Sequence, residues 1–452
     1  MAETPNTRMQ LSDRFFVVSG AGKVQPAWDV AMLNADLDTR DKCEITREEV
    51  IDRREIRDCR DQYFQDSKIN TRLARWTLNY NEVTPQIIAR WTALKEGTAA
   101  APTGTPADEI QTLTRSGTVS GGTFTISLEL EGRLVTTKPI AWNASNADIA
   151  AALTASRMRY IQPGDVTIGG TWGTAITITF PNTGRLGRAN LPLLTVDDAL
   201  LTGSTPAIVV AQTTPGEQNF HDLARSATKA KKYLSFALGW DEDIDRVEKY
   251  INHVVESVTV SASLDNQMTL QVVLVGEWEY DTIETAFSIP ECVNIDALQT
   301  TDCRIEIDSQ WESTDINSVT ATIADNVPVD RLSAFGFDSV DVQTLRRGNQ
   351  PADTLQMSVF GSQTDHVYEL AQNERTQSPV PVRLHFGMPG DRATWYFPKT
   401  KLRFQTNREG FVGDGQYSII NLEGVPFRDG ANVPFDSEAY LDQGTAFLLA
   451  SV

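Results

Sequence analysis

The stretch that decides the fold is VESVTV (255–260), followed by the polar break LDNQ (264–267) and by MTLQVVLV (268–275) before Gly276. Apolar and polar residues alternate on both sides of the break, and Val and Thr dominate. This pattern predicts a β-hairpin with one buried face. The continuous apolar run at the end of the second strand predicts cover on both faces there.

A similar pattern occurs further along the chain. DSVDV (338–342) leads through a polar break at 346–351 to TLQMSVFG (354–361). A second matched pair links residues 303–328 with residues 401–426. The order is kept at offsets of roughly 80 to 100 residues, the size of a small domain. We therefore predict an internal duplication of one β domain, with two ordinary, unrelated β domains as the alternative.

Composition limits the class of protein. The chain has 452 residues, which gives room for about three domains. It has no run of 18 apolar residues and no apolar signal core in residues 1–14, so we expect neither a membrane span nor a signal peptide. The four cysteines lack C-x-x-C spacing, which favours reduced structural thiols. A net charge of −20 argues against an ordinary DNA-binding protein and favours one that avoids adhering to a polyanion.

The N-terminal region combines a charged segment with a short helix. Residues 40–72 are dense in both signs of charge. This suits an exposed helix, or equally a polar arm or long hairpin lying on a neighbouring subunit. Residues 15–18 and 73–80 are predicted strands. Residues 84–97 predict a helix, because Thr84 suits an N-cap, a proline follows it and a glycine ends the segment.

Two linkers bound a segment of different composition. Residues 98–107 and 212–218 have the composition of linkers, and Thr, Gly and Ala prevail between them. Strand and helix patterns there predict a compact β-β-α-β-β unit. We expect residues 108–211 to be an inserted surface module, placed in a loop where insertion costs little. After it, residues 220–238 are predicted to be helical and residues 251–452 almost entirely β.

No motif builds an active site or a metal centre. GAGK (20–23) lacks the spacing and the hydroxyl residue of a phosphate loop. Asp241, Asp243 and Asp245 have the spacing of a calcium loop, but Arg246 replaces the required Gly, so a solvated acidic turn is favoured. The four histidines are scattered without an H-E-x-x-H pattern. We therefore predict no catalytic residue, no cofactor and no metal ion, and a protein that is not an enzyme.

Several of these patterns follow one another in a characteristic order. A strand precedes the pattern TPxIxAxWxAL (84–94), and then come the hairpin at 255–276, the segment 311–328 and the hairpin at 338–361. This order resembles that of the tail tube (major tail) proteins of long-tailed, siphovirus-type bacteriophages. The resemblance covers residues 1–97 and about 219–452, and it is one of pattern, since the family has no diagnostic motif.

The inserted segment has a resemblance of its own. It is similar to a module found in several phage structural proteins, with GTVSGGTFT (117–125) and WNASNADIAAAL (142–153) as its recognisable parts. The length of the chain and this insertion depart from the pattern of tail tube proteins. They leave the number of subunits in a ring open.

The resemblance implies a mainly β (α+β) fold with tandem tail-tube-like β-sandwich or barrel domains. The first would comprise residues 1–97 and 219–327, and the second residues 328–452, with 108–211 inserted. Such proteins form stacked rings whose inner sheets join into one barrel, through which DNA passes during ejection into the host without specific binding. Six subunits complete a ring when each carries one tube domain, and three when each carries two.

The resemblance also implies partners and a location. The chain would contact copies of itself, a tape measure protein and a tail terminator, but no membrane, and would reside in the virion tail after synthesis in the host cytoplasm. The main alternative is another virion component, such as a distal tail, tail terminator or capsid decoration protein. A carbohydrate-binding or hydrolytic tail protein is a further alternative, supported only by the aromatic residues.

The polar faces of the two hairpins are predicted to line the channel. An acidic lining avoids the attraction that lysine or arginine would exert on phosphates. The predicted lumen-facing residues are Glu256, Thr259, Ser261, Gln271, Asp338, Asp341, Gln343 and Gln356. Arg346 and Arg347 lie in a predicted turn, and we expect them to contact acids of the next ring.

Overall fold

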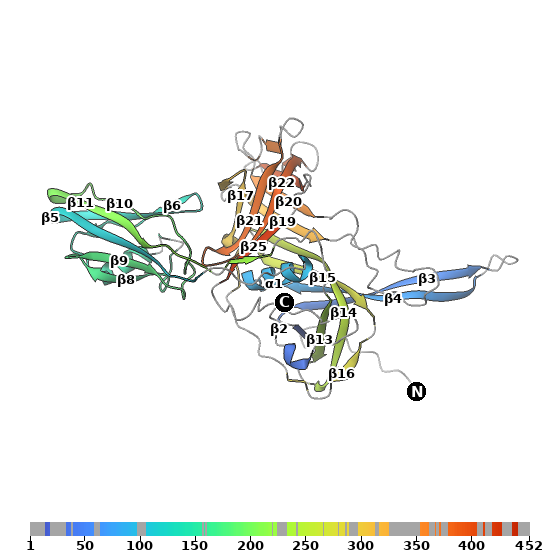
Figure 1. Cartoon of the computed structure of the whole chain (residues 1–452). Helices are drawn as coiled ribbons and strands as arrows, with labels where there is room; N and C mark the ends of the chain where they lie inside the picture. The colour runs from blue at the N-terminus through green and yellow to red at the C-terminus, as the bar shows by residue number, and fades with distance from the viewer. Residues whose placement is uncertain are drawn as a thin grey trace.

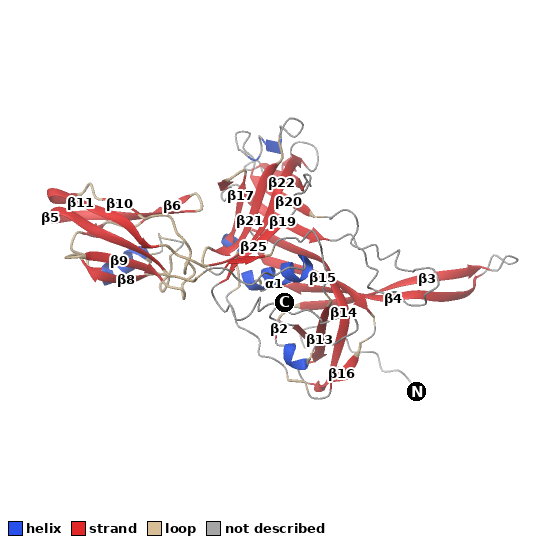
Figure 2. Ribbon diagram, viewed as in Figure 1, coloured by secondary structure: helices blue, strands red, loops and turns tan. Residues whose placement is uncertain are grey.

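Two large antiparallel sheets make up most of the molecule (Figures 1 and 2). The computed structural model describes residues 14–18, 33–37, 39–57, 64–96, 105–155, 158, 161–218, 220–223, 233–240, 243–264, 266–278, 280–284, 287–288, 297–311, 316–324, 353–360, 367, 370–371, 378–404, 410–411, 418–426 and 436–441. The strand content is 63%, which confirms the mainly β class, but the described strands form no closed barrel.

The larger sheet forms the body of the protein. Its strands are β1 (Arg14–Val18), β2 (Thr39–Asp41), β3 (Glu44–Arg57), β4 (Phe64–Tyr80), β12 (Phe220–Asp222), β13 (Leu234–Trp240), β14 (Asp243–Ser263), β15 (Asn266–Glu277), β16 (Thr282–Glu284), β17 (Cys303–Ile307), β18 (Gln310–Trp311), β19 (Ile316–Ala324), β20 (Thr354–Phe360), β21 (Val380–Met388), β22 (Asp391–Phe404), β23 (Gly410–Phe411), β24 (Ser418–Pro426) and β25 (Asp436–Leu441). Two 3-10 turns, Asn34–Asp36 and Thr300–Asp302, accompany them.

Eight of these strands follow one another in the order β3–β4–β15–β14–β19–β20–β24–β22, and every neighbouring pair is antiparallel. The order consists of two equivalent sets of four. In each set the first two strands along the chain pair with each other, β3 with β4 and β19 with β20. The fourth strand, β15 or β24, lies next to the second, and the third strand, β14 or β22, lies at the outer end beyond the fourth. The N-terminal part of β14, up to His253, also pairs with β13, as the N-terminal part of β22, up to Thr400, pairs with β21. The strand order therefore repeats within the chain.

This repeat corrects the predicted matching of hairpins. The first hairpin is confirmed, because β14 and β15 pair with Thr259 opposite Gln271. The predicted hairpin 338–361 is wrong, because β20 has β19 on one side and β24 on the other, and a strand has only two edges. The counterpart of β14–β15 is β24–β22. The predicted domain boundary at residue 328 stays a prediction, and β19, which opens the second set, precedes it.

Two further predictions concern the first half of the body. Residues 40–72 form most of the β3–β4 hairpin, so the exposed-helix alternative is wrong. Only Leu73–Tyr80 of β4 pair with β15, so the rest of this hairpin extends beyond the sheet as an arm (Figure 1). The helix predicted at 220–238 is also wrong, since β12 and β13 occupy its two ends. Pairing of β13 with β1 and β14 overrides the local helical pattern.

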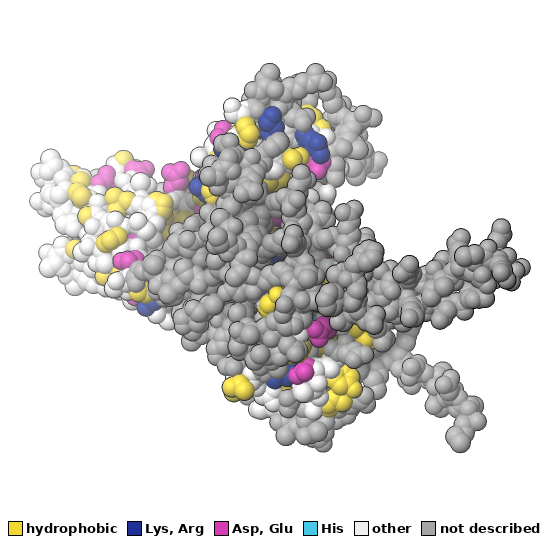
Figure 3. Space-filling model, turned by 45° about the vertical axis from the view of Figure 1, so that its right-hand side comes forward, with side chains coloured by type: hydrophobic (Ala, Val, Ile, Leu, Met, Phe, Trp, Pro, Cys, Tyr) yellow, Lys and Arg dark blue, Asp and Glu magenta, His cyan; other side chains and the backbone are white. Residues whose placement is uncertain are grey.

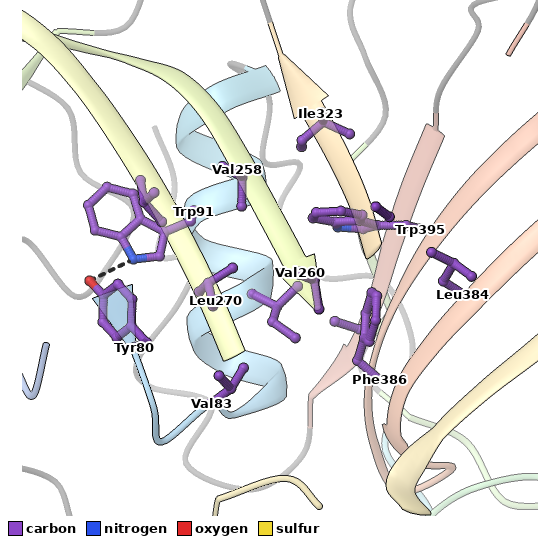
Figure 4. Packing of buried hydrophobic residues seen from close by; sticks show 14 of the residues in the cluster. Tyr80, Val83, Trp91, Val258, Val260, Leu270, Ile323, Leu384, Phe386 and Trp395 are labelled. Carbon is purple, nitrogen blue, oxygen red and sulfur yellow. Dashed lines mark hydrogen bonds between the residues drawn. The ribbon is translucent and has the colours of Figure 1, made fainter. Parts of the chain in front are cut away.

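The core of the body lies between the eight-stranded part and the elements that cover it. Helix α1 (Pro85–Glu96) begins as predicted, because the Ile87 amide donates to Thr84 Oγ1 over 3.2 Å. Trp91 packs beside Tyr80, and Trp395 approaches from the second half of the chain (Figure 4). His253 is fully buried, and burial lowers its pKa to about 3. One continuous core therefore spans both sets of strands.

The inserted segment forms the second sheet, with a core of its own (Figure 1). Helix α2 (Asn146–Leu153) starts at a capping box between Ser145 and Asp148. The predicted single helix between strands is present, with three strands before it and four after. The strands are β5 (Glu109–Leu130), β6 (Arg133–Thr136), β7 (Ile140–Ala141), β8 (Thr167–Thr171), β9 (Ala175–Phe180), β10 (Thr195–Asp197) and β11 (Leu201–Thr214).

The module contacts the body at two places. Glu131, in the turn after β5, forms ion pairs with Arg304 over 3.2 Å and with Arg392, and all three side chains are at most 13% exposed. At the second place the Gly390 amide donates to the Arg185 carbonyl oxygen over 3.0 Å, and Met388 packs into the core of the module. Two separate contacts fix the orientation of the module on the body.

Candidate assembly surface

One face of the eight-stranded part carries polar side chains in rows that cross the strands. Residues directly opposite each other in antiparallel strands point to the same face. The registers of the paired strands therefore place one row at Glu44, Asn79, Gln271, Thr259 and Thr322. A second row consists of Thr269, Ser261, Thr320, Gln356, Glu423 and Arg403. We call this surface the polar face.

Alternation along each strand explains why the polar face is continuous. The neighbours of these residues point to the opposite side, where Leu78, Val272, Val258 and Ile323 are completely buried. With polar side chains on one face and the core on the other, the described residues cover this sheet on a single side. Within this chain, Gln271, Thr269 and Gln356 are exposed.

Short polar side chains hydrogen-bond to one another across the strands. Thr259 and Thr322 bring their hydroxyl oxygens to 2.9 Å, and Ser261 and Thr320 to 3.2 Å. Gln271 Nε2 donates to Asn79 Oδ1 over 2.9 Å. These contacts join β4 to β15, and β14 to β19, through side chains as well as through the backbone. They also satisfy some of the hydrogen-bond donors and acceptors on the polar face.

The arginines on the polar face are paired with acids. Arg75 Nε and Nη2 donate to both carboxylate oxygens of Glu256, over 3.0 and 3.1 Å. Arg403 donates to Glu423 over 2.9 Å. Lys401 lies on the same face at its β22 end and is not a free charge either. Elsewhere on the chain, the described surface of the module is mostly uncharged in the view of Figure 3. The polar face therefore combines neutral hydroxyl and amide groups with internally compensated charges.

The structure brings together the predicted lumen residues that it describes. Glu256, Thr259, Ser261, Gln271 and Gln356 all lie on the polar face. The remaining predicted residues lie outside the described residues, namely Asp338, Asp341, Gln343, Arg346 and Arg347. That these side chains face a channel stays a prediction.

Sequence reasoning missed several members of the polar face. Thr320 and Thr322 belong to INSVTATIA (316–324), whose alternation was a usable signal for a strand with one polar side. Arg75 had no such signal, because its partner Glu256 is 181 residues away in the sequence.

Neither a metal site nor a match to known proteins accompanies this surface. Among the described residues no three His, Cys, Asp or Glu side chains are placed to hold a metal ion. No helix in the described part of the chain is long and apolar enough to cross a membrane. Comparison of the chain with protein-family models and with curated proteins found no match.

Proposed function

We propose that the protein is a structural subunit of a bacteriophage tail tube, which polymerises into stacked rings around a channel for DNA. The observation that carries this proposal is the polar face, a continuous surface across eight antiparallel strands of one chain. A sheet that is covered on one side and ends in strand edges is suited to joining copies of itself. A joined sheet has no edges when it closes into a ring.

The width of the sheet favours three copies in a ring. Neighbouring strands lie about 4.8 Å apart, so eight strands span about 38 Å. Three copies would close a barrel about 37 Å across, or about 48 Å with strands tilted by about 40°. Inward side chains remove about 10 Å of this diameter, which leaves room for a duplex about 20 Å wide. Two copies would leave a channel of only about 14 to 22 Å, which is tight for a duplex. Six copies would form a barrel about twice as wide as that of three.

The chemistry of the polar face suits a surface along which DNA slides. Cations that contact phosphates release counterions and create attraction. On this face Arg75 and Arg403 are engaged by Glu256 and Glu423, and the rows are otherwise mostly Thr, Ser, Asn and Gln. A net charge of −20 per chain adds repulsion. DNA would therefore pass without being held.

The positions of the β3–β4 arm and of the inserted module indicate what each would do in a tube. The β3–β4 arm extends beyond the sheet, where it would reach a neighbouring subunit (Figure 1). The module projects from the body on its own sheet, as expected of a part on the outside of a tube (Figure 1). A tape measure protein inside the tube and a terminator at its end are the further partners that this function requires. The subunits would be made in the host cytoplasm and end in the virion tail.

Electron microscopy of the purified protein, with and without a tail initiator complex, tests this proposal. We expect tubes with a central channel and a regular axial repeat. Isolated rings that never stack would instead favour a distal tail or terminator protein. A chain that remains monomeric at high concentration and with initiator present would refute the proposal.

A further inference from the structure

The chain contains one example of how its two sets of strands join. β14 closes the first set and β19 opens the second, and they pair in register from Ser257 opposite Ala324 to Ser263 opposite Ser318. Hydroxyl contacts between Thr259 and Thr322 reinforce the backbone pairing. The joint is antiparallel and keeps the polar side chains of both sets on one face. We call it the internal joint.

The eight-stranded part ends in the same two kinds of strand. β3 opens the first set, as β19 opens the second, and in the described part of the chain it pairs with β4 alone. β22 closes the second set, as β14 closes the first. Its residues Lys401–Phe404 pair with β24 on one side, whereas the pairing with β21 on the other side ends at Thr400. Among the described residues, each end of the sheet thus has an edge without a partner strand: β3 at one end, and Lys401–Phe404 of β22 at the other.

We infer that β3 of one copy pairs with the end of β22 in the next copy, in an antiparallel joint equivalent to the internal joint. Strand directions support this, because directions alternate along all eight strands and β3 is therefore antiparallel to β22 when the series repeats. Charge supports it as well. On the polar face β3 carries the exposed Glu44 and Glu48, whereas β22 carries Lys401 and Arg403, which would be shared between their contacts within the chain, such as Glu423 for Arg403, and the acids of β3. Opposite charges on paired strands are favourable.

This inference rests on the proposed function and specifies how its rings close. An open edge as long as that of the 14-residue strand β3 otherwise favours uncontrolled association. Pairing with β22 would cover the edge and extend the polar face from copy to copy. The ring would then contain two kinds of joint of the same geometry, one within each chain and one between chains.

A site-specific photo-cross-linker tests the joint without assuming its register. The exposed Thr46 of β3 is replaced by a photoreactive phenylalanine derivative, and the protein is assembled from a mixture of unlabelled and isotope-labelled chains. After irradiation we expect a link between chains, with its far end in residues 396–411. The matched control places the same group at Thr320 of the internal joint. Its link should lie within one chain, in residues 257–263 of β14 or in residues 354–358 of β20, the two strands that flank Thr320.

The outcomes separate the joint from the function. Rings or tubes in the microscope whose Thr46 link runs to another strand, or to β3 of the second chain, would overturn the joint and leave the proposed function intact. Assembled rings without any link between chains at Thr46 would do the same, provided that the Thr320 control reacts. A protein that forms no assembly in any condition would refute both the joint and the proposed function.

Discussion

Replacing Glu256 by glutamine should turn the polar face from non-adhesive to DNA-binding. The two carboxylate oxygens of Glu256 now accept from Arg75 over 3.0 and 3.1 Å. The side chains are 16% and 32% exposed, so the variant should lose only about 1 kcal/mol of unfolding free energy and remain folded. Arg75 would lose its hydrogen-bonded acid in every copy and keep only Glu48, directly opposite on β3, as a cross-strand acid. Each new phosphate contact makes the slope of the logarithm of the DNA-binding constant against the logarithm of the salt concentration steeper by about 0.9.

Retention of a fluorescent DNA duplex by assembled, purified tubes measures this effect. Wild-type tubes should retain none, whereas Glu256→Gln tubes should retain DNA at about 10 mM salt and release it near about 200 mM, where screening is stronger. The control is the double variant Arg75→Gln/Glu256→Gln, which restores neutrality and should behave as wild type. Folded, assembled Glu256→Gln tubes that retain no DNA at low salt would show that the polar face does not meet the DNA.

Three further predictions concern the module and the core. Glu131→Gln should lower the unfolding free energy by about 3 kcal/mol or more in urea titrations, because it leaves Arg304 and Arg392 buried without their acid. The exposed Glu129→Gln should change it by at most about 0.5 kcal/mol, and equal effects of the two would contradict this role. Deleting residues 108–211 should therefore also destabilise the body but still allow tube assembly in electron micrographs; a folded deletion variant that cannot assemble would place the module in the tube wall. His253 has a folded-state pKa of about 3, below its ordinary value of 6.5, so the unfolded chain binds its proton first as the pH falls. Wild type should lose about 1.4 kcal/mol per pH unit from about pH 6.5 towards pH 3 relative to His253→Gln, and parallel pH profiles would rule this out.

Local patterns were sufficient where a segment's own residues determine its structure. The alternation in 255–275 and the Thr84 cap with its proline predicted β14–β15 and the start of α1. They failed where a distant partner decides. TLQMSVFG (354–361) resembles MTLQVVLVG (268–276), yet β20 lies between β19 and β24 rather than in a hairpin. Leu223, Ala227, Ala230 and Leu234 have the spacing of a helical face, whereas Leu234, Phe236 and Leu238 alternate as a strand, and pairing with β1 and β14 selects the strand.

The candidate surface shows the same division. The polar faces of single strands follow from alternation, so Thr259, Ser261 and Gln271 could be proposed together from the sequence. Their union with Thr320, Gln356 and Glu423 into rows depends on registers between strands that are far apart along the chain. A duplication was predicted from similar segments, but the repeat of four strands lies in the order of the strands, and the matched segments are not equivalent strands.

Mass measurement of the smallest assembled ring shows directly how many chains close the tube. Eight strands per chain and a channel wide enough for DNA predict rings of three chains, with a mass of about 150 kDa for a chain of 49.9 kDa. Native mass spectrometry of rings released from tubes, with class averages from electron microscopy showing threefold symmetry, would agree with the account. Rings of six chains, or a protein that forms no ring at all, would contradict it.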